Sequence, residues 1–124
     1  MFNNLIIVGR LTKDASLKNL DSGKKLCELT IAVQRKFKNI EGNYETDFIH
    51  CTLWDSLALS ALNYGKKGSI IGVKGRLQVR KVENDKYTFY QNEVIAENVT
   101  FIAKNKKEFD KELNGEEFTE LSVI

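Results

Sequence analysis

Alternation of apolar and polar residues runs through most of this chain and predicts strands rather than helices. Successive side chains of a strand point to opposite faces of a sheet, so one parity of each strand lies inward. The run 25–35 places four apolar residues on one parity, Cys27, Leu29, Ile31 and Val33. Longer alternating runs follow at 69–82 and 87–98, and the polar residues 83–86 between them predict a hairpin turn.

The order of the predicted elements indicates a fold class. It is three strands, one helix and two strands, at 4–11 (continued at 17–20), 25–35, 46–54, 56–64, 69–82 and 87–98. Asp55 is a suitable N-cap for the helix, and Gly65 stands where a C-terminal cap belongs. One helix between the third and fourth strands of five is typical of the OB-fold, a partly open Greek-key barrel. The sequence therefore predicts an all-β OB-fold, whereas a β-sandwich would be interrupted by this helix.

The strand 46–54 carries its large aromatic side chains on the polar parity. One face holds the apolar residues Ile49, Cys51 and Leu53, which fit a core. The opposite face holds Phe48, His50, Thr52 and Trp54. Exposed rings on a strand offer surfaces on which nucleic-acid bases stack, each worth roughly 1–3 kcal/mol. The alternative is ordinary packing of Phe48 under a loop and of Trp54 on the following helix.

The strand 69–82 carries cations on its own polar parity. One face holds Lys74, Arg76 and Arg80, and the other holds Ile71, Val73, Leu77 and Val79, which are predicted to face the core. Such a stripe can follow a phosphate backbone, although a solvated strand face is the simpler explanation for an isolated stripe. It favours nucleic-acid binding if it borders the same groove as Phe48 and Trp54. The basic hairpin tip, which carries Tyr87, is a loop of the kind that grips oligonucleotides in OB-folds.

Charge is distributed unevenly along the 124 residues, whose net charge is +2. Residues 1–103 hold 15 Lys/Arg against 11 Asp/Glu, whereas residues 104–124 hold 4 against 6. We therefore expect a mildly basic folded domain at 1–103 and a flexible, charged C-terminal tail at 104–124. A basic domain permits binding to a polyanion without proving it.

Several function classes lack the residues they require. Two cysteines and one histidine give no metal-ligand spacing, so neither a metal nor a cofactor is expected. Cys27 and Cys51 fall on inward parities, which predicts packing. No nucleophile pairs with the single histidine and no phosphate-loop pattern occurs, so an enzyme is the least favoured interpretation. The short apolar run near the start fits neither a membrane span nor a signal peptide, and we expect a cytoplasmic protein.

Several blocks of the sequence together resemble the bacterial-type single-stranded DNA-binding proteins. These blocks are MFNNLIIVGRLTKD, ELTIAVQRKF, TDFIHCTLWDSLA, YGKKGSIIGVKGRLQVRK and NEV, and they fall within residues 1–103. The resemblance implies an OB-fold that coats single-stranded DNA without enzymatic activity in replication, recombination and repair. It also implies a homo-oligomer, usually a homotetramer.

The resemblance further implies which side chains contact DNA. Family members stack bases on rings at the positions that match Phe37, Phe48 and Trp54. They contact phosphates at the positions that match Arg35, Lys66, Lys67, Arg76, Arg80 and Lys81. Further candidate contacts in this sequence are Arg10, His50, Lys74 and Tyr87.

Three positions depart from the family pattern. Val82 stands where the family often has an aromatic ring, so one stacking surface is missing or is replaced by Tyr87. Ala15 replaces a common turn proline, which alters turn stiffness. The final residues, Glu116 to Ile124, lack the acidic Pro-Phe ending through which family members recruit repair proteins, and we do not expect recruitment by that route.

Two alternatives stay open at this point. The first is an OB-fold module that binds proteins, an auxiliary paralogue with weak DNA binding, which would fit Val82 and the unusual C-terminus. The second is a single-stranded RNA binder, because nothing in the sequence distinguishes a 2′-hydroxyl.

Overall fold

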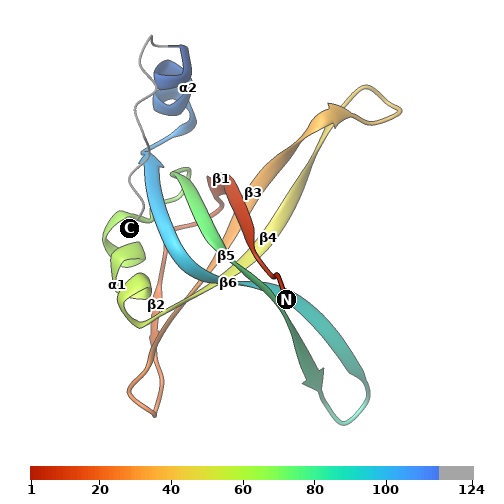
Figure 1. Cartoon of the computed structure of the whole chain (residues 1–124), viewed down its shortest axis with the longest axis vertical. Coiled ribbons are helices and arrows are strands. Elements are labelled where there is room, and N and C mark those ends of the chain that lie inside the picture. The colour runs from red at the N-terminus through yellow and green to blue at the C-terminus, as the bar shows by residue number, and fades with distance from the viewer. Residues whose placement is uncertain (115–124) are drawn as a thin grey trace.

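The computed structural model describes residues 1–114, and its strands form a barrel from which long hairpins project (Figure 1). In chain order the elements are β1 (Leu5–Leu11), β2 (Leu17–Asn19), β3 (Lys25–Lys38), β4 (Tyr44–Trp54), α1 (Asp55–Tyr64), β5 (Ile70–Glu83), β6 (Thr88–Ala103) and α2 (Lys106–Asn114).

All the strands belong to one sheet, with the order β1-β5-β6-β4-β3-β2. β1 also pairs with β3, where Arg10 lies opposite Ala32, and this pairing closes the barrel. Neighbouring strands are antiparallel except β4 and β6, which pair in parallel at Cys51 and Thr52. A closed barrel of long strands, with α1 between β4 and β5, confirms the predicted OB-fold.

The barrel interior holds the apolar parity that the alternation predicted. Its largest fully buried side chains are Leu11, Ile31, Leu53, Ile71, Val73, Val99, Cys27 and Cys51. α1 lies against β3, β4 and β6, and its Ala58 and Ala61 are fully buried in the same core. These small side chains allow the helix to approach the strands closely.

Burial should make both cysteines unreactive in the folded protein. Cys27 and Cys51 are each 1% exposed, and burial raises the pKa of both thiols, that of Cys51 to about 12. Because the thiolate is the nucleophile, we expect labelling by a thiol reagent at pH 8 to be at least about 100-fold slower in native buffer than in denaturant. Absorbance of the released chromophore measures both rates, and rapid labelling of the native protein would contradict this burial.

Two hairpins continue beyond the barrel as arms, visible on the right of Figure 1. We call residues 34–46 the β3–β4 arm and residues 76–92 the β5–β6 arm. The prediction that Leu77 and Val79 face the core is wrong, since they are 45% and 57% exposed. They share the parity of buried Val73, but β5 has left the barrel after an irregularity between Lys74 and Gly75, so no core remains for them to contact.

Two local features also differ from the sequence prediction. Residues 17–19 do not continue the first strand but form β2, which pairs antiparallel with β3 across a turn at 20–24. α1 begins at Asp55 itself, with φ of 49°, and its carboxylate accepts the backbone N–H of Lys25 at 3.1 Å instead of capping the helix. Asp55 therefore links the start of β3 to the start of α1.

The described part of the predicted flexible tail contains a helix, α2. The Asn105 side-chain oxygen accepts the N–H of Glu108 at 2.7 Å, and the Glu108 carboxylate accepts the N–H of Lys104 at 2.8 Å. Lys106 and Asp110 form an i,i+4 ion pair. These are helix-start and helix-face interactions, at a place where the sequence predicted no helix. The flexibility of the tail stays a prediction. The domain boundary at residue 103 stays a prediction, and residues 115–124, with the unusual ending, lie outside the described residues.

Candidate nucleic-acid interface

β4 turns its aromatic side chains away from the core, as its parity predicted. Phe48 is 64% and Trp54 37% exposed, whereas Cys51 and Leu53 are at most 1% exposed. His50 lies between the two rings, exposed, with Nδ1 3.2 Å from the hydroxyl of Thr30. We call this side of β3, β4, β6 and β5 the outer face. Six residues of extended strand place the two rings roughly 20 Å apart, so they would contact different bases of one strand.

Thr52 lies on the polar parity of β4 but is not exposed to solvent. It is 6% exposed, and its hydroxyl donates to Oε2 of Glu93 at 3.1 Å. β6 runs directly beside β4 here, with Thr52 opposite Ile95, and covers the side chain. The outer face therefore has a buried polar contact between its exposed rings.

Strand register places the cation stripe of β5 on the outer face. Thr52 of β4 lies opposite Ile95 of β6, which in turn lies opposite Arg76 of β5. Arg76 donates to Gln78 at 2.7 Å, and Arg80, on the same parity, donates to Gln91 at 3.5 Å. Aromatic rings and guanidinium groups thus share one continuous sheet surface.

Arg10 of β1 adjoins this surface, because β1 pairs with β3 at this position. It lies opposite Ala32 of β3, and Ala32 lies opposite Phe48 of β4. Side chains directly opposite one another on one face have Cβ atoms about 5 Å apart, so Arg10, Ala32 and Phe48 form one transverse row. Lys74 has the parity of Arg76 but lies opposite Ile6 of β1.

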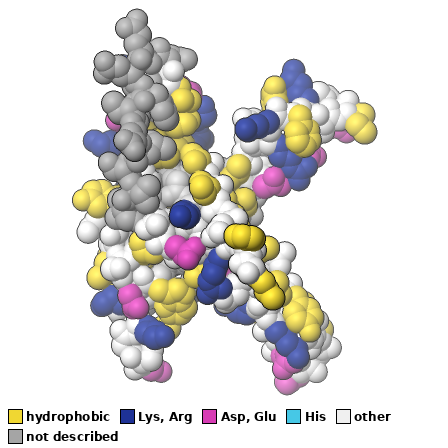
Figure 2. Space-filling model, viewed as in Figure 1, with side chains coloured by type: hydrophobic (Ala, Val, Ile, Leu, Met, Phe, Trp, Pro, Cys, Tyr) yellow, Lys and Arg dark blue, Asp and Glu magenta, His cyan; other side chains and the backbone are white. Residues whose placement is uncertain are grey.

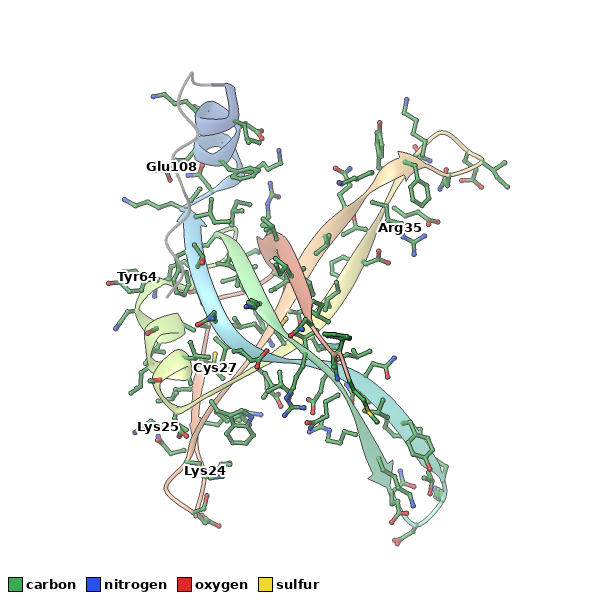
Figure 3. All side chains as sticks on the ribbon, in the orientation of Figure 1. Lys24, Lys25, Cys27, Arg35, Tyr64 and Glu108 are labelled. Atoms are coloured by element: carbon green, nitrogen blue, oxygen red, sulfur yellow. The ribbon has the colours of Figure 1, made fainter. Side chains whose placement is uncertain are left out.

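Lys24 is a candidate contact that the sequence interpretation missed. Lys24 belongs to the turn of the β2–β3 hairpin (Figure 3), and its Nζ lies 6.0 Å from the centre of the Trp54 ring. A lysine over an indole is attracted by the negative face of the ring and leaves its charge available to a phosphate. The signal in the sequence was the basic pair Lys24–Lys25 directly after a Gly-containing turn.

Arg35 is held by two carboxylates on the β3–β4 arm (Figure 3). Its Nε and Nη2 donate to Asp47 at 3.0 and 2.9 Å, and its Nη1 donates to Glu45 at 2.6 Å. These hydrogen bonds raise the pKa of Arg35 and lower the pKa of Asp47, so the pairing persists at neutral pH and is lost only when acid protonates the carboxylate. The Arg35 guanidinium, which is predicted to contact phosphate, is therefore already bonded to two carboxylates.

Removing these carboxylates should therefore strengthen binding to a polyanion. With Glu45→Gln and Asp47→Asn combined, we expect affinity for an oligonucleotide to rise several-fold at low salt, because Arg35 is released and two repelling charges are lost. The salt dependence should steepen by about 0.7 in log–log slope, the contribution of one additional phosphate contact on a single strand. Glu41→Gln, on the same arm but not bonded to Arg35, is the matched control. An unchanged slope in the double variant would show that Arg35 gains no phosphate contact.

The β3–β4 arm carries further exposed rings. Phe37 is 69% and Tyr44 48% exposed, and Nζ of Lys38 lies 5.7 Å from the Tyr44 ring. Ile40 at the tip is fully exposed. The predicted stacking residue Phe37 thus lies on the projecting arm, outside the barrel wall that carries Phe48.

Four predicted contacts lie away from the barrel wall of the outer face. Lys66 and Lys67 belong to the loop after α1, where the N–H of Lys67 donates to Asp14 at 2.7 Å. Lys81 and Tyr87 lie towards the tip of the β5–β6 arm, where Lys81 pairs with Glu83 at 2.7 Å and the Tyr87 ring packs on Phe89. Figure 2 shows cations and apolar side chains together on both arms.

Comparison with known protein families shows to which family the chain belongs. The model of the Single-strand binding protein family matches residues 2–102. The chain belongs to this family.

Individual relatives agree over most of the chain. Single-stranded DNA-binding protein B of Bacillus subtilis is 42% identical over 109 residues, which are 87% of this chain and 96% of that protein. Single-stranded DNA-binding protein 3 of Streptococcus agalactiae is 38% identical over 116 residues, 93% of this chain and 84% of that protein. Single-stranded DNA-binding protein of Bacillus cereus is 47% identical over 103 residues, 82% of this chain and 61% of that protein.

Family membership confirms the resemblance drawn from the sequence blocks and supports the expectation of a non-enzymatic protein. Within residues 1–114, no group of His, Cys, Asp and Glu side chains could hold a metal ion. In the same part of the chain, no helix is long and apolar enough to cross a membrane.

Proposed function

We propose that this chain binds single-stranded DNA without sequence preference, by stacking bases on exposed rings and pairing phosphates with nearby cations. The observation that carries this proposal is the continuous outer face, on which Phe48 and Trp54 share a sheet surface with Arg76 and Arg80. Stacking tolerates any base because every base has an aromatic face, and cations bind the backbone, which is common to all sequences. The names of the relatives support the same ligand.

The proposed contacts fall into two groups. Stacking is assigned to Phe37, Phe48, Trp54 and Tyr87. Phosphate or polar contacts are assigned to Arg10, His50, Lys66, Lys67, Lys74, Arg76, Arg80 and Lys81, with Lys24 added by its position over Trp54. Arg35 joins this group only when it exchanges its carboxylate partners for phosphate.

Trp54 provides a direct test because it is the only tryptophan of the chain. We expect its fluorescence to be quenched on addition of oligo-dT, with affinity that falls steeply as salt rises. Competition by oligo-rU would establish the preference between DNA and RNA. Unchanged emission together with no salt-sensitive binding would contradict the proposal and would favour the alternative of a protein-binding OB-fold module.

A homo-oligomer, and by family resemblance a tetramer, is part of the same proposal. β1 pairs with β5 along its length but with β3 only at its end, so most of its second edge is unpaired within the described residues. Its exposed side chains Ile6 and Val8 offer apolar surface to a second copy. Light scattering with and without oligo-dT would report the mass of the assembly, and a monomer under both conditions would contradict it.

We further propose a cytoplasmic role in replication, recombination or repair, where single strands occur.

A further inference from the structure

We propose that α2 is part of the subunit interface and that its ring Phe109 receives Phe2 of a second copy of the chain. The contact lies in a groove of about 470 Å³ between β1, β3, β4 and α2, which we call the α2 groove. The inference rests on the homo-oligomer included in the proposed function, and it names side chains that hold the copies together.

The N-terminal segment continues the line of β1 and leaves Phe2 uncovered. The Asn3 side chain donates to the carbonyl oxygen of Leu77 at 2.8 Å and accepts the N–H of the same residue at 2.9 Å. Asn3 thereby extends the register in which Leu5 lies opposite Gly75. Phe2, one residue further, is 98% exposed. An aromatic ring held at the end of a strand and left in water is apolar surface that a partner can bury.

The α2 groove offers apolar surface of the kind that a ring requires. Phe109 is half-buried, so part of its ring stays accessible. No aspartate or glutamate lines the groove. Most of its lining is apolar side chains or glycine, namely Val8, Gly9, Ala32, Val33, Ile70 and Phe109. A second ring that enters there packs against Phe109 and against the strands below it.

Phe2 cannot reach the α2 groove of its own chain. The N-terminus lies at one end of β1, and α2 lies beyond the other end (Figure 1). Val8 is the first residue of the chain that lines the groove. The six residue steps from Phe2 to Val8 span roughly 20 Å in a strand, and the bonds of Asn3 to β5 prevent the segment from folding back. The occupant is therefore a second copy.

Two-fold symmetry brings the second copy's N-terminal end to the groove. Within the described residues, β1 pairs with β3 only at Arg10 and Leu11, so its edge at residues 5–8 is unpaired. Most symmetric assemblies contain two-fold axes. Two such edges related by an axis perpendicular to the sheet run antiparallel, so the start of one β1 lies beside the end of the other. Because β3 occupies the edge from Arg10 onwards, the entering strand ends beside Val8.

The same symmetry decides which side chains face the groove. An axis perpendicular to the sheet places the outer faces of both copies on one side, so residues of equal parity share a face. Phe2 and Asn4 of the second copy therefore point to the same side as Val8 and Arg10, which line the α2 groove. Each copy inserts its own Phe2 into the other, and every symmetric pair of subunits contains two such contacts.

A second copy in the α2 groove leaves the DNA-binding residues accessible. Phe48 and Trp54 do not line the groove. The long aliphatic stems of Arg10 and Lys106 can cover the inserted ring while their charged ends stay in water, as the 51% exposure of the Lys106 side chain illustrates. The cations therefore remain available to phosphate beside the interface.

The first test joins the two proposed partners between copies. Full chains with Phe2→Cys and with Phe109→Cys are co-expressed and treated with a short bismaleimide. The native Cys27 and Cys51 are buried and do not react. We expect covalent dimers, identified by mass, that contain one copy of each variant. Phe2→Cys with Leu113→Cys, an exposed position of α2 outside the groove, is the matched control and should give few.

The second test measures the strength of the assembly on dilution by light scattering. Phe2→Ala should raise the dissociation constant about 10-fold or more, because each symmetric pair loses two buried rings. This variant keeps the barrel folded, since Phe2 is 98% exposed. Phe109→Ala should weaken the assembly as well, and the double variant should be weakened by less than the two effects combined, because the rings contact each other. Leu113→Ala should have no effect.

The outcomes separate this inference from the proposed function. A monomeric unaltered chain would overturn the proposed oligomer, and the inference with it. An unaltered chain that assembles, together with a Phe2→Ala variant that assembles equally well and no cross-link from Phe2→Cys to Phe109→Cys, would overturn only the role of α2. If Phe109→Ala lowers helix content by circular dichroism, Phe2→Ala and the cross-link decide.

Discussion

Replacing Phe48 and Trp54 together by alanine should weaken the binding of oligo-dT about 30-fold or more and leave the barrel folded. Each base stacked on a ring contributes roughly 1–3 kcal/mol, and the two rings lie too far apart to share a base. The fold should survive because both side chains point away from the core, with Phe48 64% exposed. Trp54 fluorescence is lost in this variant, so binding is measured by anisotropy of a labelled oligonucleotide.

The matched control removes two apolar side chains elsewhere. Leu59 and Leu62 on α1 are 42% and 39% exposed, comparable to Trp54, and they do not belong to the outer face. Leu59→Ala with Leu62→Ala should therefore bind oligo-dT as the unaltered chain does. If the Phe48 and Trp54 variant also binds normally while remaining folded, stacking on β4 is not the basis of binding.

The central feature of the site could be predicted from the sequence because strand geometry has a fixed period of two. Once residues 46–54 are assigned to a strand, Ile49, Cys51 and Leu53 on one side require Phe48 and Trp54 on the other. The burial of these side chains agrees with that assignment. Parity does not show where along a strand the barrel ends. Leu77 has the parity of Val73 but lies beyond the end of the barrel, where no core exists.

Other features depend on contacts between distant segments. The sequence contains Arg35, Glu45 and Asp47, but only the β3–β4 pairing, with its irregularity between Gln34 and Lys38, brings them together. Lys24 over Trp54 likewise follows from the pairing of β3 with β4. α2 is different, because its start signals are local. Asn105, three residues before Glu108, matches an N-cap pattern. The charge composition of residues 104–124 gives no indication of this helix.

Gly75→Ala should destabilise the folded protein by about 3 kcal/mol or more, a large effect for adding one methyl group. A Cβ at this position would lie 2.2 Å from the carbonyl oxygen of Ile95 and 3.2 Å from Cα of Ala96. Both are backbone atoms of the neighbouring strand β6, so they cannot turn aside as a flexible side chain could. The strands must separate where β6 is irregular and the β5–β6 arm leaves the barrel.

Gly72→Ala, on the same strand, is the control for the change in backbone freedom. Its Cβ would meet no atom closer than 3.6 Å, so we expect a change within about 1 kcal/mol in urea unfolding. Where Gly75→Ala remains folded at low temperature, the displaced β5–β6 arm should carry Arg76 and Arg80 away from β4 and weaken oligo-dT binding as well. Equal stability of the two variants would mean that β5 and β6 do not approach each other this closely. In that case the register that joins the cation stripe to the aromatic rings of β4 would have to be revised.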